Sequence, residues 1–255
     1  MLDDTRETEG IKTMTETPKQ YIDRALRSDE NKDELQTVIH LYIDETKDDL
    51  NTNFAMSATA TDKPDEFVRI SQMLRTSWER HSIAKYGATS EDLRDKIPKY
   101  SGSPNHVKEW ILGEIASTGA RTYGVHIDRS EDEGWKRYSA SGIQKRQIRE
   151  LTDIAFDDLE DKSILVIMEQ SSDYSENITD YVERRGRGAG KKVFALLESS
   201  KTGDHKEGLH MADFVTGALG EYIKTGSTDK IDIVGMKGEK NEDRIMADRP
   251  KRMRK

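Results

Sequence analysis

Apolar residues in this chain fall first into two β-branched runs and then into a stretch with helical spacing. The run from Val38 to Ile43 ends at Asp44 and Glu45, and it predicts a largely buried strand. A turn-forming stretch separates it from residues 53–60, which predict a second strand paired with the first as a hairpin. Between residues 64 and 86 apolar side chains recur at steps of three and four, which predicts a helix.

From residue 104 onward the pattern alternates between helix and strand. Pro104 suits the first turn of a helix, and Gly119 lies beyond its predicted end. The elements predicted next are a strand at 121–128, a helix at 143–159, a strand at 163–169, a helix at 174–185, a strand at 192–198 and a helix at 208–224. This order predicts an α/β fold whose mixed sheet has an antiparallel first hairpin, parallel later strands and helices on both faces.

The same pattern divides the chain into three segments. Residues 1–36 are a polar N-terminal arm, in which Thr17 and Pro18 predict the start of a short helix. Residues 37–226 contain the α/β domain, and residues 227–255 form a C-terminal extension that ends in a basic tail.

Composition narrows the class of protein. The chain of 255 residues contains no cysteine, which excludes a disulfide scaffold, a cysteine zinc site, an iron–sulfur cluster and a thiol nucleophile. No apolar run approaches the length of a membrane span, and the N-terminus lacks the apolar core of a signal peptide, so we expect a soluble cytoplasmic protein with no membrane partner. The net charge of −8 argues against a general nucleic-acid coat.

Three acidic residues stand where a site can form. Asp44 and Glu169 end predicted strands, and ligands of open α/β sheets collect at the carboxyl ends of strands. Asp213 lies in the most apolar predicted helix, where a carboxylate is costly unless it is paired or bound to a metal. Such carboxylates suit Mg²⁺ or Mn²⁺. Each residue also has a structural alternative. Asp44 can begin the hairpin turn, Glu169 can end its strand in solvent, and Asp213 can pair with a basic side chain.

Two motifs carry a resemblance to a known family. Tyr42-Ile43-Asp44-Glu45 resembles the opening strand of the domain of unknown function 3800 family, and Gly208 to Ala218 is similar to its closing helix. Ser199 and Ser200 resemble the pair that follows the family's last strand, whereas the family's middle Glu-Ile-Lys motif is altered here to Lys96-Ile97-Pro98-Lys99-Tyr100-Ser101. The resemblance implies a ribonuclease H-like fold in which Asp44, Glu169 and Asp213 hold the catalytic metals.

Other side chains are candidates for the same site. Strand alternation points Glu45 away from Asp44, yet at a strand end it can turn inward as a further metal ligand. His210 stands where the family usually has Gln, and it is a candidate proton donor or hydrogen-bond partner. His210 and Asp213 can also meet on one helix face and form a separate zinc cluster with His205 and Asp204. His126 and Asp128 share one strand face, where Asp128 can act as an auxiliary ligand or cap a loop.

Basic residues concentrate in two segments despite the acidic balance. Residues 181–192 carry a net charge of +4, and residues 244–255 carry +5. A phosphate backbone can bind such patches. The first segment supplies the candidate nucleic-acid contacts Arg184, Arg185, Arg187, Lys191 and Lys192. Its glycine-rich part does not match a phosphate-binding P-loop, because the spacing and the helix–loop–strand order both differ from that motif.

These observations lead to a hypothesis and two alternatives. The hypothesis is a metal-dependent nuclease that acts on DNA or RNA with Mg²⁺ or Mn²⁺ held by the three carboxylates. The first alternative is a non-catalytic ribonuclease H-like binding module linked to a mobile-element or defence system. The second is an interaction protein whose N-terminal arm and helix 64–86 form the surface of a homo-oligomer.

Overall fold

The structure is a computed structural model that describes residues 38–47, 53–86, 89, 98–128, 138–160, 163–170, 174 and 177–235. The predicted polar arm at 1–36 and the basic tail at 244–255 lie outside the described residues. None of the described helices is both long enough and apolar enough to cross a membrane.

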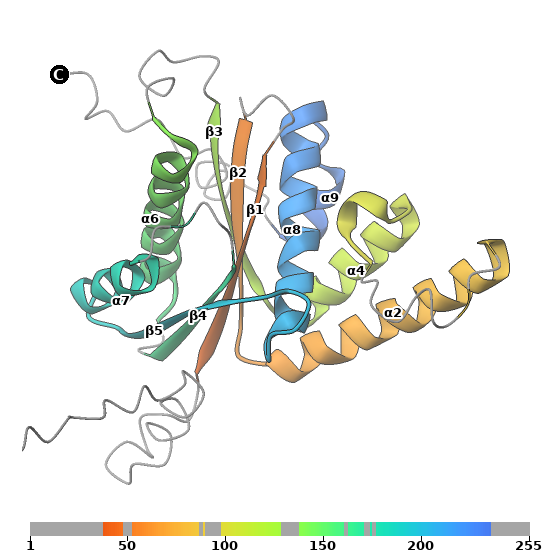
Figure 1. Ribbon diagram of the computed structural model, residues 1–255, viewed down its shortest axis with the longest axis horizontal. Helices are drawn as coiled ribbons and strands as arrows, with labels where there is room; N and C mark the ends of the chain where they lie inside the picture. The colour runs from red at the N-terminus through yellow and green to blue at the C-terminus, as the bar shows by residue number, and fades with distance from the viewer. Residues whose placement is uncertain are drawn as a thin grey trace, which may run out of the picture. The chain divides into compact units, whose positions relative to one another are not determined.

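A five-stranded mixed sheet forms the centre of the described domain (Figure 1). Its strands, in spatial order, are β3 (Arg121–Asp128), β2 (Asn53–Thr61), β1 (Ile39–Lys47), β4 (Ser163–Glu169) and β5 (Lys192–Glu198). The first three strands pair antiparallel, whereas β1, β4 and β5 are parallel. The predicted α/β class, with its antiparallel hairpin and parallel later strands, is confirmed, and the arrangement is consistent with a ribonuclease H-like fold.

Helices cover both faces of this sheet (Figure 1). On one face lie α6 (Ala140–Asp158) and α7 (Ile178–Gly188). On the other lies α8 (Lys206–Thr225), with α2 (Pro64–Tyr86), α4 (Asn105–Ser117) and α9 (Asp229–Ile233) packed against its outer side. A short 3-10 turn, η2 (Tyr100–Gly102), also contacts α8. The predicted helical cover on both faces is therefore confirmed.

Several element bounds differ from the predictions. Strand β1 continues to Lys47, α7 begins at Ile178 instead of residue 174, and α9 was not predicted at all. Tyr174 and Ile178 are four residues apart, which imitates helical spacing. In the structure Tyr174 instead packs against the core from the segment before the helix.

Strand alternation gives the two faces of β1 different neighbours. Leu41 and Ile43 are fully buried in the cluster that β1 shares with α6 and α7. Tyr42 faces α8, where a Cβ added at Gly208 would overlap the Tyr42 ring. Helix α8 can therefore lie close along β1 only because residue 208 is glycine, and this approach places Asp213 over the carboxyl end of the strand.

Candidate metal centre

Asp44 and Glu169 lie side by side at one edge of the sheet. They end the parallel neighbours β1 and β4, in which Ile43 is in register with Met168. Both carboxyl groups face α8, and they are within hydrogen-bonding reach of each other. The Asp44 residue is only 6% exposed. This register brings the two strand-end carboxylates together, as the sequence predicts.

Asp213 joins this pair from α8. Its Oδ2 atom accepts a hydrogen bond of 2.8 Å from the backbone amide of Tyr100. Asp213 makes no ion pair with any residue in the described part of the chain. The alternative in which a basic side chain neutralises Asp213 through an ion pair is therefore wrong for the described residues.

The three carboxyl groups influence one another electrostatically. Burial raises the pKa of Asp44 well above its usual range, and the charges of Asp213 and Glu169 raise it further. Burial also raises the pKa of Asp213, against the opposing effects of the Tyr100 amide and the Lys99 charge. Crowded carboxylates of this kind repel unless protons or a cation neutralise them, so the group has the charge that a divalent ion would complement.

The donor chemistry therefore fits a hard cation such as Mg²⁺ or Mn²⁺. Among the residues that the structure describes, no group of three or more acidic or histidine side chains already has the spacing of a metal site. Two donor oxygens are engaged elsewhere, because Asp213 accepts from Tyr100 and Glu169 Oε1 accepts from the Ser200 hydroxyl. A cation would bind here only after the carboxylates turn toward a shared point.

His210 supports this group indirectly. Its Nε2 atom lies 2.8 Å from the carbonyl oxygen of Ser200, the residue whose hydroxyl donates to Glu169. Its Nδ1 atom lies 3.3 Å from the Ser71 hydroxyl on α2. Burial lowers the pKa of His210, which favours the neutral ring. With both ring nitrogens engaged, the geometry favours the hydrogen-bond role predicted for His210 over proton donation.

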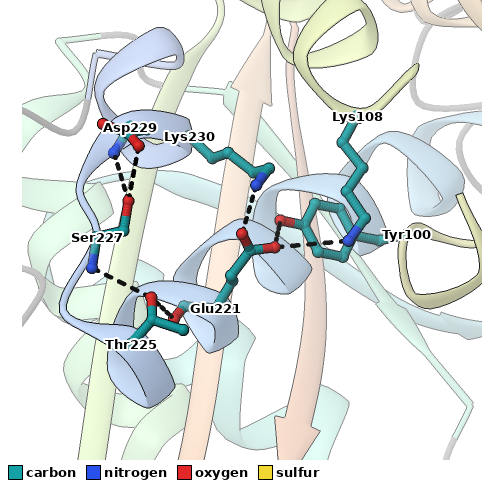
Figure 2. Close-up of polar contacts among 7 residues, drawn as sticks. All are labelled: Tyr100, Lys108, Glu221, Thr225, Ser227, Asp229 and Lys230. Atoms are coloured by element: carbon teal, nitrogen blue, oxygen red, sulfur yellow. Dashed lines mark hydrogen bonds and ion pairs between the residues drawn. The ribbon is translucent and has the colours of Figure 1, made fainter. Parts of the chain in front are cut away.

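Tyr100 supplies the backbone amide that holds Asp213, a role that has no signature in the sequence. Its hydroxyl donates a 2.7 Å hydrogen bond to Glu221, which also pairs with Lys108 and Lys230 (Figure 2). Its ring packs on α8, where a Cβ added at Gly217 would overlap it. Residue 217 is therefore a glycine at the place where Tyr100 approaches the helix closely.

Glu45 does not share a face with Asp44. Its Oε2 atom accepts a hydrogen bond from Gln144 of α6, on the other side of the sheet. Because β1 continues as a regular strand to Lys47, alternation persists at Glu45 and the side chain does not turn inward. The expectation that Glu45 turns toward the other carboxylates is therefore wrong.

The predicted nucleic-acid contacts lie far from the three carboxylates. Lys192 begins β5 in register with Ser163, whereas Glu169 is at the opposite end of β4. Six strand residues separate these ends, which is about 20 Å. Arg185 is paired with Asp153 of α6, on the face opposite α8. The remaining members are Arg184 and Arg187 on α7 and Lys191, whose ammonium donates to the Leu159 carbonyl.

The alternative histidine cluster does not form. His205 pairs with Glu198 at a distance of 2.9 Å between Nδ1 and Oε1, while His210 contacts Ser200 and Ser71. His126 lies 2.9 Å from the side-chain oxygen of Asn53. In the described residues, therefore, His205 and His210 are directed to different partners.

Comparison with known proteins adds no functional assignment for these residues. The chain matches no protein-family model, and no curated protein matches it significantly. The resemblance to the domain of unknown function 3800 family consequently rests on the two short motifs and on the placement of their acidic residues.

In the absence of divalent metal, Asp44 is expected to make folding stability fall with rising pH. Its pKa is raised in the folded state, so the unfolded chain loses this proton first as the pH rises from about 4. The folded state then binds more protons than the unfolded state, and the free energy of unfolding falls across this window. Asp44→Asn removes the effect, so its stability advantage over the wild type should grow from pH 4 to pH 7 in urea unfolding with EDTA. An advantage that stays constant with pH would contradict the assignment.

Proposed function

We propose that this protein is a divalent-metal-dependent nuclease of ribonuclease H-like type that hydrolyses phosphodiester bonds. Asp44, Glu169 and Asp213 would hold Mg²⁺ or Mn²⁺. The observation that supports this most is the meeting of three carboxyl groups from β1, β4 and α8, of which that of Asp44 is buried and has no basic side chain paired with it among the described residues. The family resemblance, which puts the same three residues on the metals, points the same way.

When bound, the cation supplies Lewis-acid stabilisation of phosphate charge and lowers the pKa of the attacking water. The protein's own part is to hold and orient the donors. Ser200 donates to Glu169, and the Tyr100 amide donates to Asp213, so two of the three carboxylates are restrained from turning freely. Lys99 is an exposed side chain whose charge acts on Asp213, and it can attract a phosphate oxygen to the same place.

The basic residues of α7 and the turn before β5 would act at a distance from the cleaved bond. A separation of about 20 Å corresponds to roughly six base pairs of duplex along its axis. Lys192 would therefore contact phosphates well away from the carboxylates, and Arg184 and Arg187 would contact phosphates from α7. A nucleic acid shorter than this distance would lose their contribution to binding.

The second candidate is a ribonuclease H-like module that binds nucleic acid without cleaving it. It is favoured by one observation, which is that no group of three donors among the described residues already has metal-site spacing. This candidate predicts binding that is independent of divalent ions, whereas the nuclease requires them.

The nuclease and the binding module are distinguished by incubating the full chain with labelled single-stranded and duplex DNA, with RNA and with a DNA–RNA hybrid. Each substrate is tested with Mg²⁺, with Mn²⁺ and with EDTA. The nuclease predicts cleavage of at least one substrate that EDTA abolishes. Binding of a substrate without cleavage under any of these conditions would favour the binding module.

A further inference from the structure

Two histidines from distant parts of the chain meet beside the start of β1. His40 is the second residue of β1, and His205 directly precedes α8. Their ring centroids are 5.8 Å apart, and the ring planes are inclined at 54°. Asp44 lies four residues further along β1, about 13 Å away, so this pair is separate from the carboxylate group.

Each ring uses its Nδ1 atom for a hydrogen bond, and that of His205 goes to a carboxylate, the usual partner of a metal-binding histidine. His40 Nδ1 lies 3.2 Å from the Tyr42 hydroxyl, and His205 Nδ1 lies 2.9 Å from Glu198 Oε1. The Nε2 atom of neither ring has a hydrogen-bond partner in the described structure. Histidines that bind a metal through one nitrogen almost always use the other for a carboxylate, carbonyl or water, which fixes the ring orientation.

The spacing of the rings also suits a shared ion. A zinc–nitrogen bond of about 2.0–2.1 Å puts each ring centroid about 3.2 Å from the metal. With both Nε2 atoms directed at one ion, centroids 5.8 Å apart correspond to an angle of roughly 130° at the metal. This angle is about 20° wider than the tetrahedral value of a four-coordinate zinc ion, a difference that small shifts of the two rings would remove.

Acidic side chains act on the two histidine rings and their neighbours, and protons compete little with a metal ion for His40. Asp65, an exposed residue at the start of α2, acts electrostatically on His40 and opposes the repulsion from His205. Glu198 and Glu207 act on the neighbouring Tyr42. Burial, followed by the His205 charge, lowers the pKa of His40 to about 4. His40 is therefore neutral near pH 7, the form that binds metals.

We propose that His40 and His205 bind one transition-metal ion of the zinc type through their Nε2 atoms, with water as the further ligands. The ion joins the start of β1 to the start of α8, the helix that carries Asp213. Because two of its ligands are imidazole nitrogens, this site prefers Zn²⁺ or Co²⁺ over Mg²⁺. This site does not depend on the proposed nuclease activity, and it is tested separately.

The test is a titration of the metal-free full chain with Co²⁺, followed by its visible absorption. The parent protein carries Asp44→Asn, so that the carboxylate group contributes little. One equivalent of Co²⁺ should give the visible bands of a four-coordinate ion, and Zn²⁺ should displace it. His205→Ala and His40→Gln should each weaken Co²⁺ binding at least tenfold, whereas His106→Ala, an exposed change on α4, should not. Equal binding in all these proteins would overturn the proposal.

A second measurement covers the case in which a histidine variant folds poorly. Glu198→Gln keeps both metal ligands and weakens only the partner of His205, so Co²⁺ affinity should fall by about 10-fold to 100-fold. Zn²⁺ should also raise the Tm of the parent protein and leave that of His205→Ala unchanged. An equal rise in both proteins would place the zinc elsewhere and contradict the site.

Discussion

Asp44→Asn is expected to abolish metal-dependent cleavage, with a loss of about 10³-fold or more in kcat/KM. A factor of that size corresponds to about 4 kcal/mol of transition-state stabilisation. The amide is a neutral and weaker ligand for a hard cation, and Asp44 is the buried centre of the three carboxyl groups. The measurement is the initial rate on whichever substrate the wild type cleaves, with Mn²⁺ varied from limiting to saturating.

Glu45→Gln is the matched control, because Glu45 is the next residue and loses the same charge. Its side chain contacts Gln144 on the opposite face of the sheet, so the rate should stay within about tenfold of the wild type. Similar losses in both variants would show that the face of the sheet does not matter, and would contradict the assignment of the site to the α8 side.

Gly217→Ala is expected to lower the free energy of unfolding strongly for so small a substitution, by about 3 kcal/mol. The added Cβ would overlap the Tyr100 ring, which also packs edge-on against Phe214 and is held by Glu221. Overpacking of this kind costs about 1–3 kcal/mol or more, because the ring or the helix must shift. Urea unfolding monitored by circular dichroism measures the change, and Mn²⁺ affinity should fall with it because the Tyr100 amide holds Asp213.

Gly113→Ala on α4 is the comparison, because a Cβ added there meets no atom within 4 Å. That substitution should be neutral or stabilising by up to about 1 kcal/mol, as expected for glycine replaced within a helix. If both glycine variants unfold at the same urea concentration, the close approach of Tyr100 to α8 is not what the structure indicates.

Local periodicity was enough to predict most of the fold and part of the site. The strands at 121–128, 163–169 and 192–198 have the predicted bounds, because short apolar runs between turn residues leave little ambiguity. Asp44 and Glu169 followed from the same reasoning, since parallel neighbouring strands bring their carboxyl ends to one edge. Asp213 was found because an acidic residue in an apolar helix is unusual.

What the sequence did not reveal depends on contacts between distant segments. The Tyr100 amide reaches Asp213 from a 3-10 turn 113 positions earlier in the chain, and a backbone donor has no side-chain signature. The basic residues near 184–192 are neighbours in the sequence, but the direction of β5 puts Lys192 at the end of the strands opposite Glu169. The pairing of His40 with His205 likewise needs the packing of α8 on β1.

The most direct test of the central claim is a crystal of the full chain soaked in Mn²⁺ and measured for anomalous scattering. The account predicts a peak bound by carboxylate oxygens of Asp44, Glu169 and Asp213, and no such peak in Asp44→Asn crystals treated alike. Crystals that show these three carboxylates without a manganese peak between them at saturating Mn²⁺ would contradict the metal centre, and the nuclease proposal with it.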